Sequence, residues 1–154
     1  MGEGLRQRIR QQKFSSTQQE SLLNVMVAAN YVREQSELVV RAHGITLPQY
    51  NVLRILRGAH PDGHPRYEIA RRMLDRAPDV TRIIDRLAEK KLVERDRGAS
   101  DRRHSVTRIT REGLKLLERI DPEMVKAFAP MEARLTQRDA RELSRLCEAL
   151  YEGT

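Results

Sequence analysis

The fold of this chain is decided by residues 66–95, RYEIARRMLDRAPDVTRIIDRLAEKKLVER. Apolar residues recur here at three- and four-residue steps in two groups, Ile69, Ala70 and Met73, then Val80, Ile83, Ile84, Leu87 and Ala88. This spacing is typical of amphipathic helices. Proline is tolerated at the first position of a helix, so Pro78 marks the start of the second one. We therefore predict helices over 67–74 and 78–90, joined by a tight turn.

The polar face of the second helix is basic at its centre. Asp79, Arg82 and Arg86 stand at i, i+3 and i+7, opposite the apolar stripe. An arginine that points away from a helix is suited to guanine O6 and N7 or to phosphate. The alternative is a solvated face on which Arg82 and Arg86 form ion pairs with Asp79 and Asp85.

A hairpin follows the helix pair. Residues 92–95, LVER, and 105–109, SVTRI, have the composition of short strands, and the connection between them is polar and contains Gly98. Two helices joined by a tight turn and followed by a hairpin make a winged helix-turn-helix, in which the second helix enters the major groove of DNA. The sequence therefore predicts a DNA-reading lobe with a two-stranded β-wing.

Long helices flank this lobe on both sides. An apolar stripe predicts a helix over 17–43, which Gly44 ends. A second helix begins at Leu47 and Pro48 and runs to Gly58. A loop rich in glycine and proline follows it. The stripe of this first helix consists of Leu22, Val25, Met26, Ala29, Val32, Val39 and Val40.

Helical periodicity returns after Thr110. Leu114, Leu117, Ile120, Val125 and Phe128 are expected to point inward. Asp121-Pro122 is expected to kink or briefly interrupt the helix, and Pro130 to end it. Thr136 and Asp139 have the spacing of a capping box, and the last helix has an inner face of Ala140, Leu143, Leu146, Cys147 and Leu150. These terminal stripes exceed what one small lobe covers, and a two-fold dimer is the usual way to bury such a surplus.

The composition favours a polyanionic partner. The formal net charge is +7, with a net +4 in residues 1–60, +4 in 61–110 and −1 in 111–154. Nucleic acid is the commonest such partner for a basic protein, although charge alone also fits a solvated surface that happens to be basic. Aromatic residues make up 4% of the 154, so the core is expected to be aliphatic.

Several classes of function find no support in the sequence. No apolar run is long enough for a membrane helix or the core of a signal peptide, and we expect a cytoplasmic protein. Cys147 is the single cysteine, and His60 and His64 lie in a loop rather than on a helical face, so we expect no disulfide and no metal. No nucleotide-binding or hydrolase motif is present, so we expect neither a cofactor nor an enzyme.

Several segments together resemble the MarR family. Four of these segments are LPQYNVL at 47–53, EIA at 68–70, APDVTRIIDRL at 77–87 and KLVER at 91–95. In the wing, Asp101-Arg102-Arg103 resembles the D-x-R motif of the family. Ile109-Thr110, which follows, resembles the family's Leu-Thr pair. The likeness covers about residues 20 to 150, with the segments in the family's order and spacing.

The resemblance implies one MarR-like domain over 1–154 that acts as a homodimer on a pseudo-palindromic operator. Residues 45–110 would form the DNA-binding lobe, and 17–43 and 111–152 the dimerisation helices. Carried over residue by residue, the recognition helix would use Pro78, Asp79, Thr81, Arg82 and Arg86, and the wing Arg97, Asp101, Arg102 and Arg103. Arg103 would enter the minor groove while Asp101 holds an arginine in position; the alternative for both is an ordinary charged turn.

The family commonly takes a small anionic or phenolic effector between the lobe and the dimer helices. In this sequence that junction would offer His43, Tyr50 and Arg54, and a satisfied interfacial cluster without a ligand is equally compatible with them. The sequence thus predicts a dimeric, sequence-specific transcriptional regulator of double-stranded DNA, a repressor released by an effector. A weakly selective architectural DNA-binding protein is the alternative.

Overall fold

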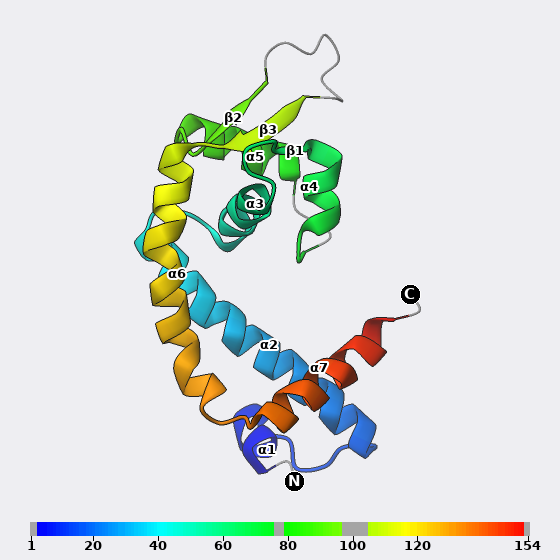
Figure 1. The fold of residues 1–154 in the computed structure, drawn as a ribbon. Helices are drawn as coiled ribbons and strands as arrows, with labels where there is room; N and C mark the ends of the chain where they lie inside the picture. The colour runs from blue at the N-terminus through cyan, green and yellow to red at the C-terminus, as the bar shows by residue number, and fades with distance from the viewer. Residues whose placement is uncertain (1–2, 76–78, 97–104, 153–154) are drawn as a thin grey trace.

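The computed structural model describes residues 3–75, 79–96 and 105–152. It confirms the predicted fold class, because seven helices and one small antiparallel sheet account for these residues (Figure 1). The elements are α1 (Glu3–Ile9), α2 (Thr17–Ala42), α3 (Leu47–Gly58), β1 (His64–Pro65), α4 (Arg66–Arg72), α5 (Val80–Glu89), β2 (Val93–Arg95), β3 (Val106–Ile109), α6 (Arg111–Glu132) and α7 (Gln137–Tyr151).

The sheet contains a third strand that the sequence did not predict. The two predicted strands pair in antiparallel fashion, with Val93 opposite Ile109, and the two-residue β1 adds to the other side of β3 in the order β1-β3-β2. The glycine- and proline-rich segment was expected to be loop throughout, because two residues are too few to show alternation. Gly63 lets the chain approach β3, since it has a φ of +77° and a Cβ there would collide with the Thr107 carbonyl oxygen.

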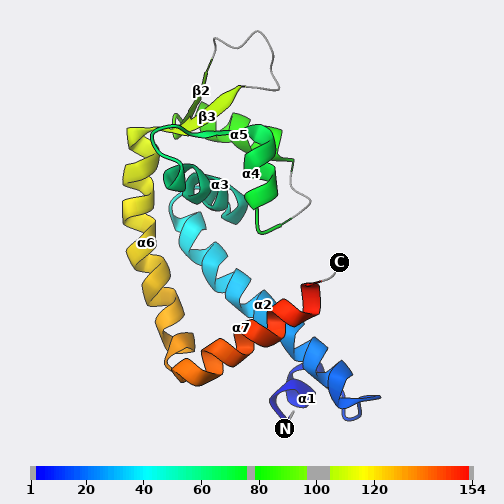
Figure 2. The same cartoon turned by 45° about the vertical axis from the view of Figure 1, so that its right-hand side comes forward.

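An aliphatic core holds the lobe together. It joins the end of α2, α3, α4, α5, the sheet and the first half of α6, and its fully buried large side chains are Val40, Val52, Leu53, Leu56, Ile69, Ile84, Leu87, Leu117 and Ile120. Burying one such side chain contributes roughly 1.5–3 kcal/mol, so the packing of α4 and α5 on α3 fixes the direction in which their polar faces point. The lobe lies at one end of the molecule (Figure 2).

The start of α5 differs from the predicted one. The helix begins at Val80 rather than Pro78, and Asp79 is its N-cap, whose carboxylate accepts a hydrogen bond of 3.2 Å from the backbone N–H of Arg82. An aspartate cap satisfies one of the free N–H groups of the first turn and places a negative charge at the positive end of the helix dipole. Proline and aspartate are both common at helix starts, which is why the sequence pattern placed the boundary two residues early.

Neither proline of α6 interrupts or ends the helix. The helix passes through Pro122 and Pro130 and ends at Glu132. Each proline removes one helical hydrogen bond, but Ile120 and Met124 on either side of Pro122 are buried in the core, and this packing favours a continuous helix. Val125 was expected to point inward and is 65% exposed.

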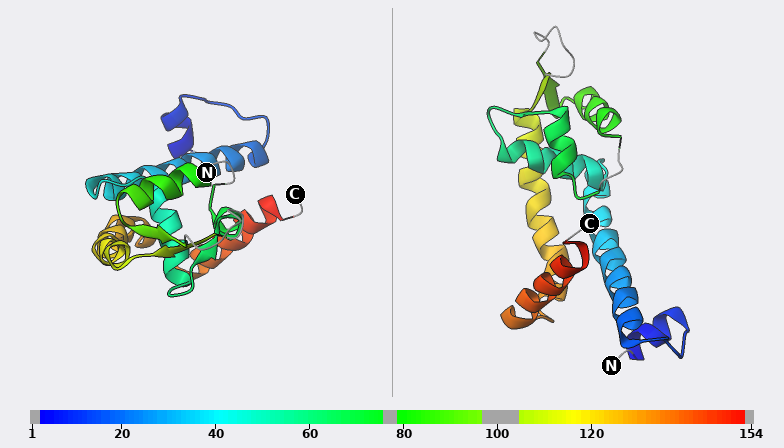
Figure 3. Two further views of the ribbon diagram at one scale, coloured as in Figure 1. Left: turned by 90° about the horizontal axis from the view of Figure 1, so that it is seen from above. Right: turned by 90° about the vertical axis from the view of Figure 1, so that its right-hand side faces the viewer.

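The terminal helices extend away from the lobe. The left and right views of Figure 3 show α2 and α7 as separate arms. No residue of α7 is buried within the single chain. Cys147 was expected to be a core residue, but it is only partly buried. The helix α1 was not predicted from the sequence, since seven residues with one buried side chain, Leu5, carry little periodicity. Over the residues described, no helix is both long and apolar enough to span a bilayer.

Candidate nucleic-acid interface

The outer face of α5 is polar and exposed. Val80, Ile84 and Leu87 are buried beneath the helix, whereas Thr81, Arg82 and Arg86 are exposed on its other side. The helix is capped and packed along its whole length, so these polar side chains are presented by a rigid element. An α-helix of this kind fits a major groove about 12 Å wide.

The carboxylates next to these arginines are engaged elsewhere. Asp79 caps the helix, and Asp85 pairs with Arg95 of β2 at 2.7 Å. Within the described parts of the chain, no carboxylate forms an ion pair with Arg82 or Arg86. The ion-paired face that was the alternative reading of this sequence is therefore absent from the described residues, and α5 presents two guanidiniums to solvent.

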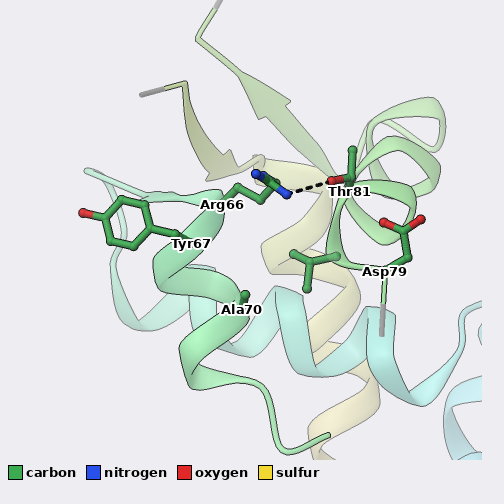
Figure 4. A pocket seen from close by; sticks show the side chains of 6 residues that line it. Arg66, Tyr67, Ala70, Asp79 and Thr81 are labelled. Carbon is green, nitrogen blue, oxygen red and sulfur yellow. Dashed lines mark hydrogen bonds between the residues drawn. The ribbon is translucent and has the colours of Figure 1, made fainter. Parts of the chain in front are cut away.

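The start of α4 adds two residues that the sequence analysis did not identify. Arg66 donates a hydrogen bond of 3.3 Å from Nη1 to Oγ1 of Thr81, and Tyr67 is 56% exposed beside it. Figure 4 shows both around a shallow hollow of about 380 Å³ between α4 and α5, which Ala70, Asp79 and Val80 also line. The position of Arg66 at the start of the first helix of the pair was the one available signal, because that helix crosses the DNA backbone in this motif.

The base of the wing is held by polar contacts at both strands. Arg108 of β3 pairs with Asp96 at 3.3 Å, and the Ser105 hydroxyl donates to the Asp96 carbonyl oxygen at 3.2 Å. Five of the predicted DNA-binding residues lie outside the described residues, namely Pro78 of the recognition helix and Arg97, Asp101, Arg102 and Arg103 of the wing.

The three predicted effector residues each contact a neighbouring side chain. Tyr50 is buried and its hydroxyl donates to Asp121 of α6 at 2.9 Å, while the Arg54 guanidinium lies 5.9 Å from the Tyr50 ring centre. The Nε2 atom of His43 lies 3.1 Å from a carboxylate oxygen of Glu123, without hydrogen-bond geometry. His43, the residue after α2, therefore takes part in a second contact with α6.

Asp121 is the centre of this junction. It accepts from Tyr50 and from Arg57, whose Nη1 lies 2.5 Å from it. Burial alone would raise the pKa of Asp121, but the hydrogen bonds from Arg57 and Tyr50 outweigh it and lower that pKa. Burial and the hydrogen bond to Asp121 raise the pKa of Tyr50. The junction is thus a neutral phenol and an ionised carboxylate bridged to an arginine.

The helix pair α4 and α5, the exposed polar face of α5 and the β2–β3 hairpin define a winged helix-turn-helix protein. Comparison with known proteins supports a narrower assignment, since the sequence model of the MarR family matches residues 45–105. A MarR transcription factor from Planctomyces limnophilus is 34% identical, with a TM-score of 0.69 over 89% of this chain and 99% of that one. This chain belongs to the MarR family of transcriptional regulators.

Two further relatives extend the comparison. The homoprotocatechuate degradative operon repressor of Escherichia coli is 28% identical over 110 residues, which are 71% of this chain and 73% of that protein. The MepR protein of S. aureus, solved in complex with DNA, shares the fold with a TM-score of 0.75, 20% identity and coverage of 92% of this chain and all of that one. The relatives are regulators, in agreement with the expectation of a regulator rather than an enzyme.

Proposed function

We propose that the protein is a homodimeric repressor that binds a pseudo-palindromic site on double-stranded DNA. Each lobe, residues 45–110, places α5 in the major groove and the wing in the adjacent minor groove. Residues 17–43 and 111–152 form the dimerisation region, and 1–154 is one domain. The observation that carries the proposal is the exposed face of α5, where Arg82 and Arg86 have no carboxylate partner among the described residues.

The DNA contacts follow from the chemistry of this face. Arg82 and Arg86 are one helical turn apart and present planar donor groups that match guanine O6 and N7 or two phosphates. Arg66 and Tyr67 lie near Thr81 at the start of α4, where a helix-turn-helix meets the backbone. In the wing, Arg97, Arg102 and Arg103 would contact phosphate or the minor groove, and Asp101 would orient an arginine.

Dimerisation is supported by apolar side chains that the single chain leaves exposed. Leu22, Met26 and Val32 of α2 are 50%, 62% and 42% exposed, and Leu143, Leu146 and Leu150 of α7 are 48%, 49% and 53% exposed. Monomeric proteins rarely expose apolar stripes of this length. A second copy with the same stripes covers both of them through a two-fold axis, which also places two lobes for two half-sites.

Release by a small anionic or phenolic effector fits the charged junction between lobe and long helices. Arg57 and Tyr50 of α3 both bind the carboxylate of Asp121, and a ligand carboxylate has the same chemistry as that side chain. A ligand that replaced Asp121 there, with Arg54 and His43 nearby, would change how α3 sits on α6. Repression is supported by the named function of the Escherichia coli relative.

Selection from a random duplex library tests the proposal. The purified protein should enrich one near-palindromic sequence and bind it at least roughly 10³-fold more tightly than a shuffled duplex. Arg119→Ala removes one exposed arginine from the middle of α6 and should leave the selected sequence unchanged, whereas Arg86→Ala should weaken binding. Binding of every duplex with similar affinity would instead identify a weakly selective architectural protein and would overturn the proposal.

A further inference from the structure

The hydrogen bond between Arg66 and Thr81 has only one chemical direction. A guanidinium carries five N–H donors, no acceptor, and stays protonated in proteins, so the Thr81 oxygen must be the acceptor in the 3.3 Å contact. The hydroxyl proton of Thr81 then points away from Arg66. Thr81 is exposed, so this proton is available to a molecule that lies on the face of α5.

Both partners are held in place by the lobe. Thr81 is the second residue of α5, between Val80, which is buried, and Arg82, whose backbone N–H is bound by the Asp79 cap. Arg66 is the first residue of α4, directly after Pro65, which pairs with Val106 in the sheet. Arg66 is therefore positioned by β1, which pairs with β3 of the wing, and Thr81 by α5.

Thr81 lies where a recognition helix reads bases. In helix-turn-helix proteins, the residues at the N-terminal end of the second helix contact base edges. The major groove offers acceptors at purine N7, guanine O6 and thymine O4, whereas cytosine offers only the N4 amino donor. A hydroxyl that is free to rotate accepts or donates, and thus tolerates both kinds of base. A hydroxyl whose oxygen already accepts from Arg66 keeps its proton and one lone pair. The positive guanidinium makes that lone pair a poorer acceptor and the proton a better donor, so the hydroxyl favours a base that accepts.

We propose that Arg66 sets the hydrogen-bonding polarity of Thr81, so that position 81 selects purine or thymine and discriminates against cytosine at one base pair in each half-site. Arg66 is a positioning residue here and acts through Thr81. This inference rests on the proposed function, because it requires α5 to lie in the major groove. No carboxylate forms an ion pair with Arg66 among the residues described, so its charge also remains available for the DNA backbone.

The test compares base preferences rather than affinities. Random-duplex selection with sequencing is run on the full-length protein and on four variants: Thr81→Val, Thr81→Ser, Arg66→Met and Arg66→Lys. The unchanged protein should disfavour cytosine at one position of each half-site by about 3- to 10-fold, the range that one hydrogen bond provides. Thr81→Val should abolish that penalty at this position alone, and Thr81→Ser should keep it.

The Arg66 variants separate polarity from charge. Arg66→Met should reduce the cytosine penalty to less than about twofold and also weaken binding to every duplex, while Arg66→Lys, which again offers only donors, should restore much of the penalty. Where the selected base is adenine, whose one major-groove acceptor is N7, 7-deazaadenine at that position should weaken binding by about 3- to 10-fold for the unchanged protein and leave Thr81→Val unaffected.

Three results would overturn the inference. A base profile unchanged in Thr81→Val would show that the hydroxyl does not read a base, and a full cytosine penalty in Arg66→Met would show that Arg66 does not set its polarity. Failure of the unchanged protein to enrich any sequence would overturn the proposed function itself, and the inference with it. Thermal unfolding of each variant confirms that the lobe is folded before its profile is interpreted.

Discussion

Arg33 of α2 holds Asp75 with two hydrogen bonds, Nη2 to Oδ1 at 2.9 Å and Nη1 to Oδ2 at 3.1 Å. The two residues are 42 positions apart, and Asp75 precedes the N-cap of α5 by four. The long helix outside the lobe is therefore connected to the turn before the recognition helix. Asn51 of α3 fixes the same turn through the Leu74 N–H at 3.0 Å.

A double-mutant cycle should measure this connection. Both side chains are nearly half exposed, so we expect Arg33→Ala and Asp75→Ala to be coupled by about 0.5–1 kcal/mol in the free energy of unfolding, despite the two-pronged geometry. Arg33→Lys should lose part of this coupling, because an ammonium group does not match both carboxylate oxygens. Additive effects of the two alanine substitutions in chemical denaturation would contradict the contact.

The dimer prediction can be tested on α7. Light scattering should give a mass of about 36 kDa, twice the 17.9 kDa of one chain. Leu143→Asp places a carboxylate in the apolar stripe and should shift the protein towards a mass near one chain. Arg141→Asp places the same group on the opposite face of α7 and should leave the dimer intact. If the unsubstituted protein is a monomer, or if Leu143→Asp and Arg141→Asp change the mass equally, the apolar stripe of α7 is not the dimer interface.

Gly113 at the start of α6 should tolerate no side chain. A Cβ there would collide with the Leu92 carbonyl oxygen and lie 2.7 Å from Cγ1 of Ile109. Gly113→Ala is expected to lower the free energy of unfolding by about 1–3 kcal/mol in urea denaturation. Gly58→Ala is the control, since nothing lies within 4 Å of a Cβ at the end of α3, and should be neutral or slightly stabilising. Equal changes in the free energy of unfolding for Gly113→Ala and Gly58→Ala would contradict the close packing of α6 on the sheet.

The junction at Asp121 should make stability depend on pH in acid. Its pKa is lowered in the folded protein, so its contribution is complete above the ordinary aspartate value near 3.8 and is lost as the pH falls through the lowered pKa. Asp121→Asn should therefore cost about 1 kcal/mol at about pH 6 and progressively less below about pH 4. Denaturation curves at several pH values provide the measurement.

The Arg57→Met background serves as the control for this pH effect. Arg57 is one of the two donors that lower the Asp121 pKa, so the same Asp121→Asn substitution should show a smaller pH dependence without it. In the background that keeps Arg57, the free energy of unfolding lost by Asp121→Asn should shrink from neutral to acid pH. If that loss were the same at both pH values, the Asp121 carboxylate would not be stabilised in its ionised form.

Periodic patterns predicted the elements that bury many residues. The stripe of α5, from Val80 to Leu87, recurs often enough to identify both the helix and its exposed face. The two-residue β1 and the seven-residue α1 were missed because so few residues show no period. The prolines of α6 were expected to interrupt or end the helix, but it continues through both, and packing on both sides of Pro122 outweighs the loss of one hydrogen bond there.

The partners of the site residues could not be predicted. Sequence spacing placed Asp85 beside Arg82 and Arg86, but the fold brings Arg95 to it instead. Arg66 meets Thr81 across 15 residues, and Tyr50 meets Asp121 across 71. Such pairs depend on how the helices pack, and no local pattern in the sequence carries that information.

Base reading by α5 is best measured at Arg82, because this arginine stands on the exposed face of α5 without a carboxylate partner among the described residues. Fluorescence anisotropy titrations compare the unchanged protein and Arg82→Ala on the selected duplex and on a shuffled one. If α5 reads bases, the substitution should cost roughly 1 to 3 kcal/mol of binding free energy on the selected site and far less on the shuffled duplex. Equal losses on the two duplexes would show that Arg82 contacts only the backbone and would contradict the account.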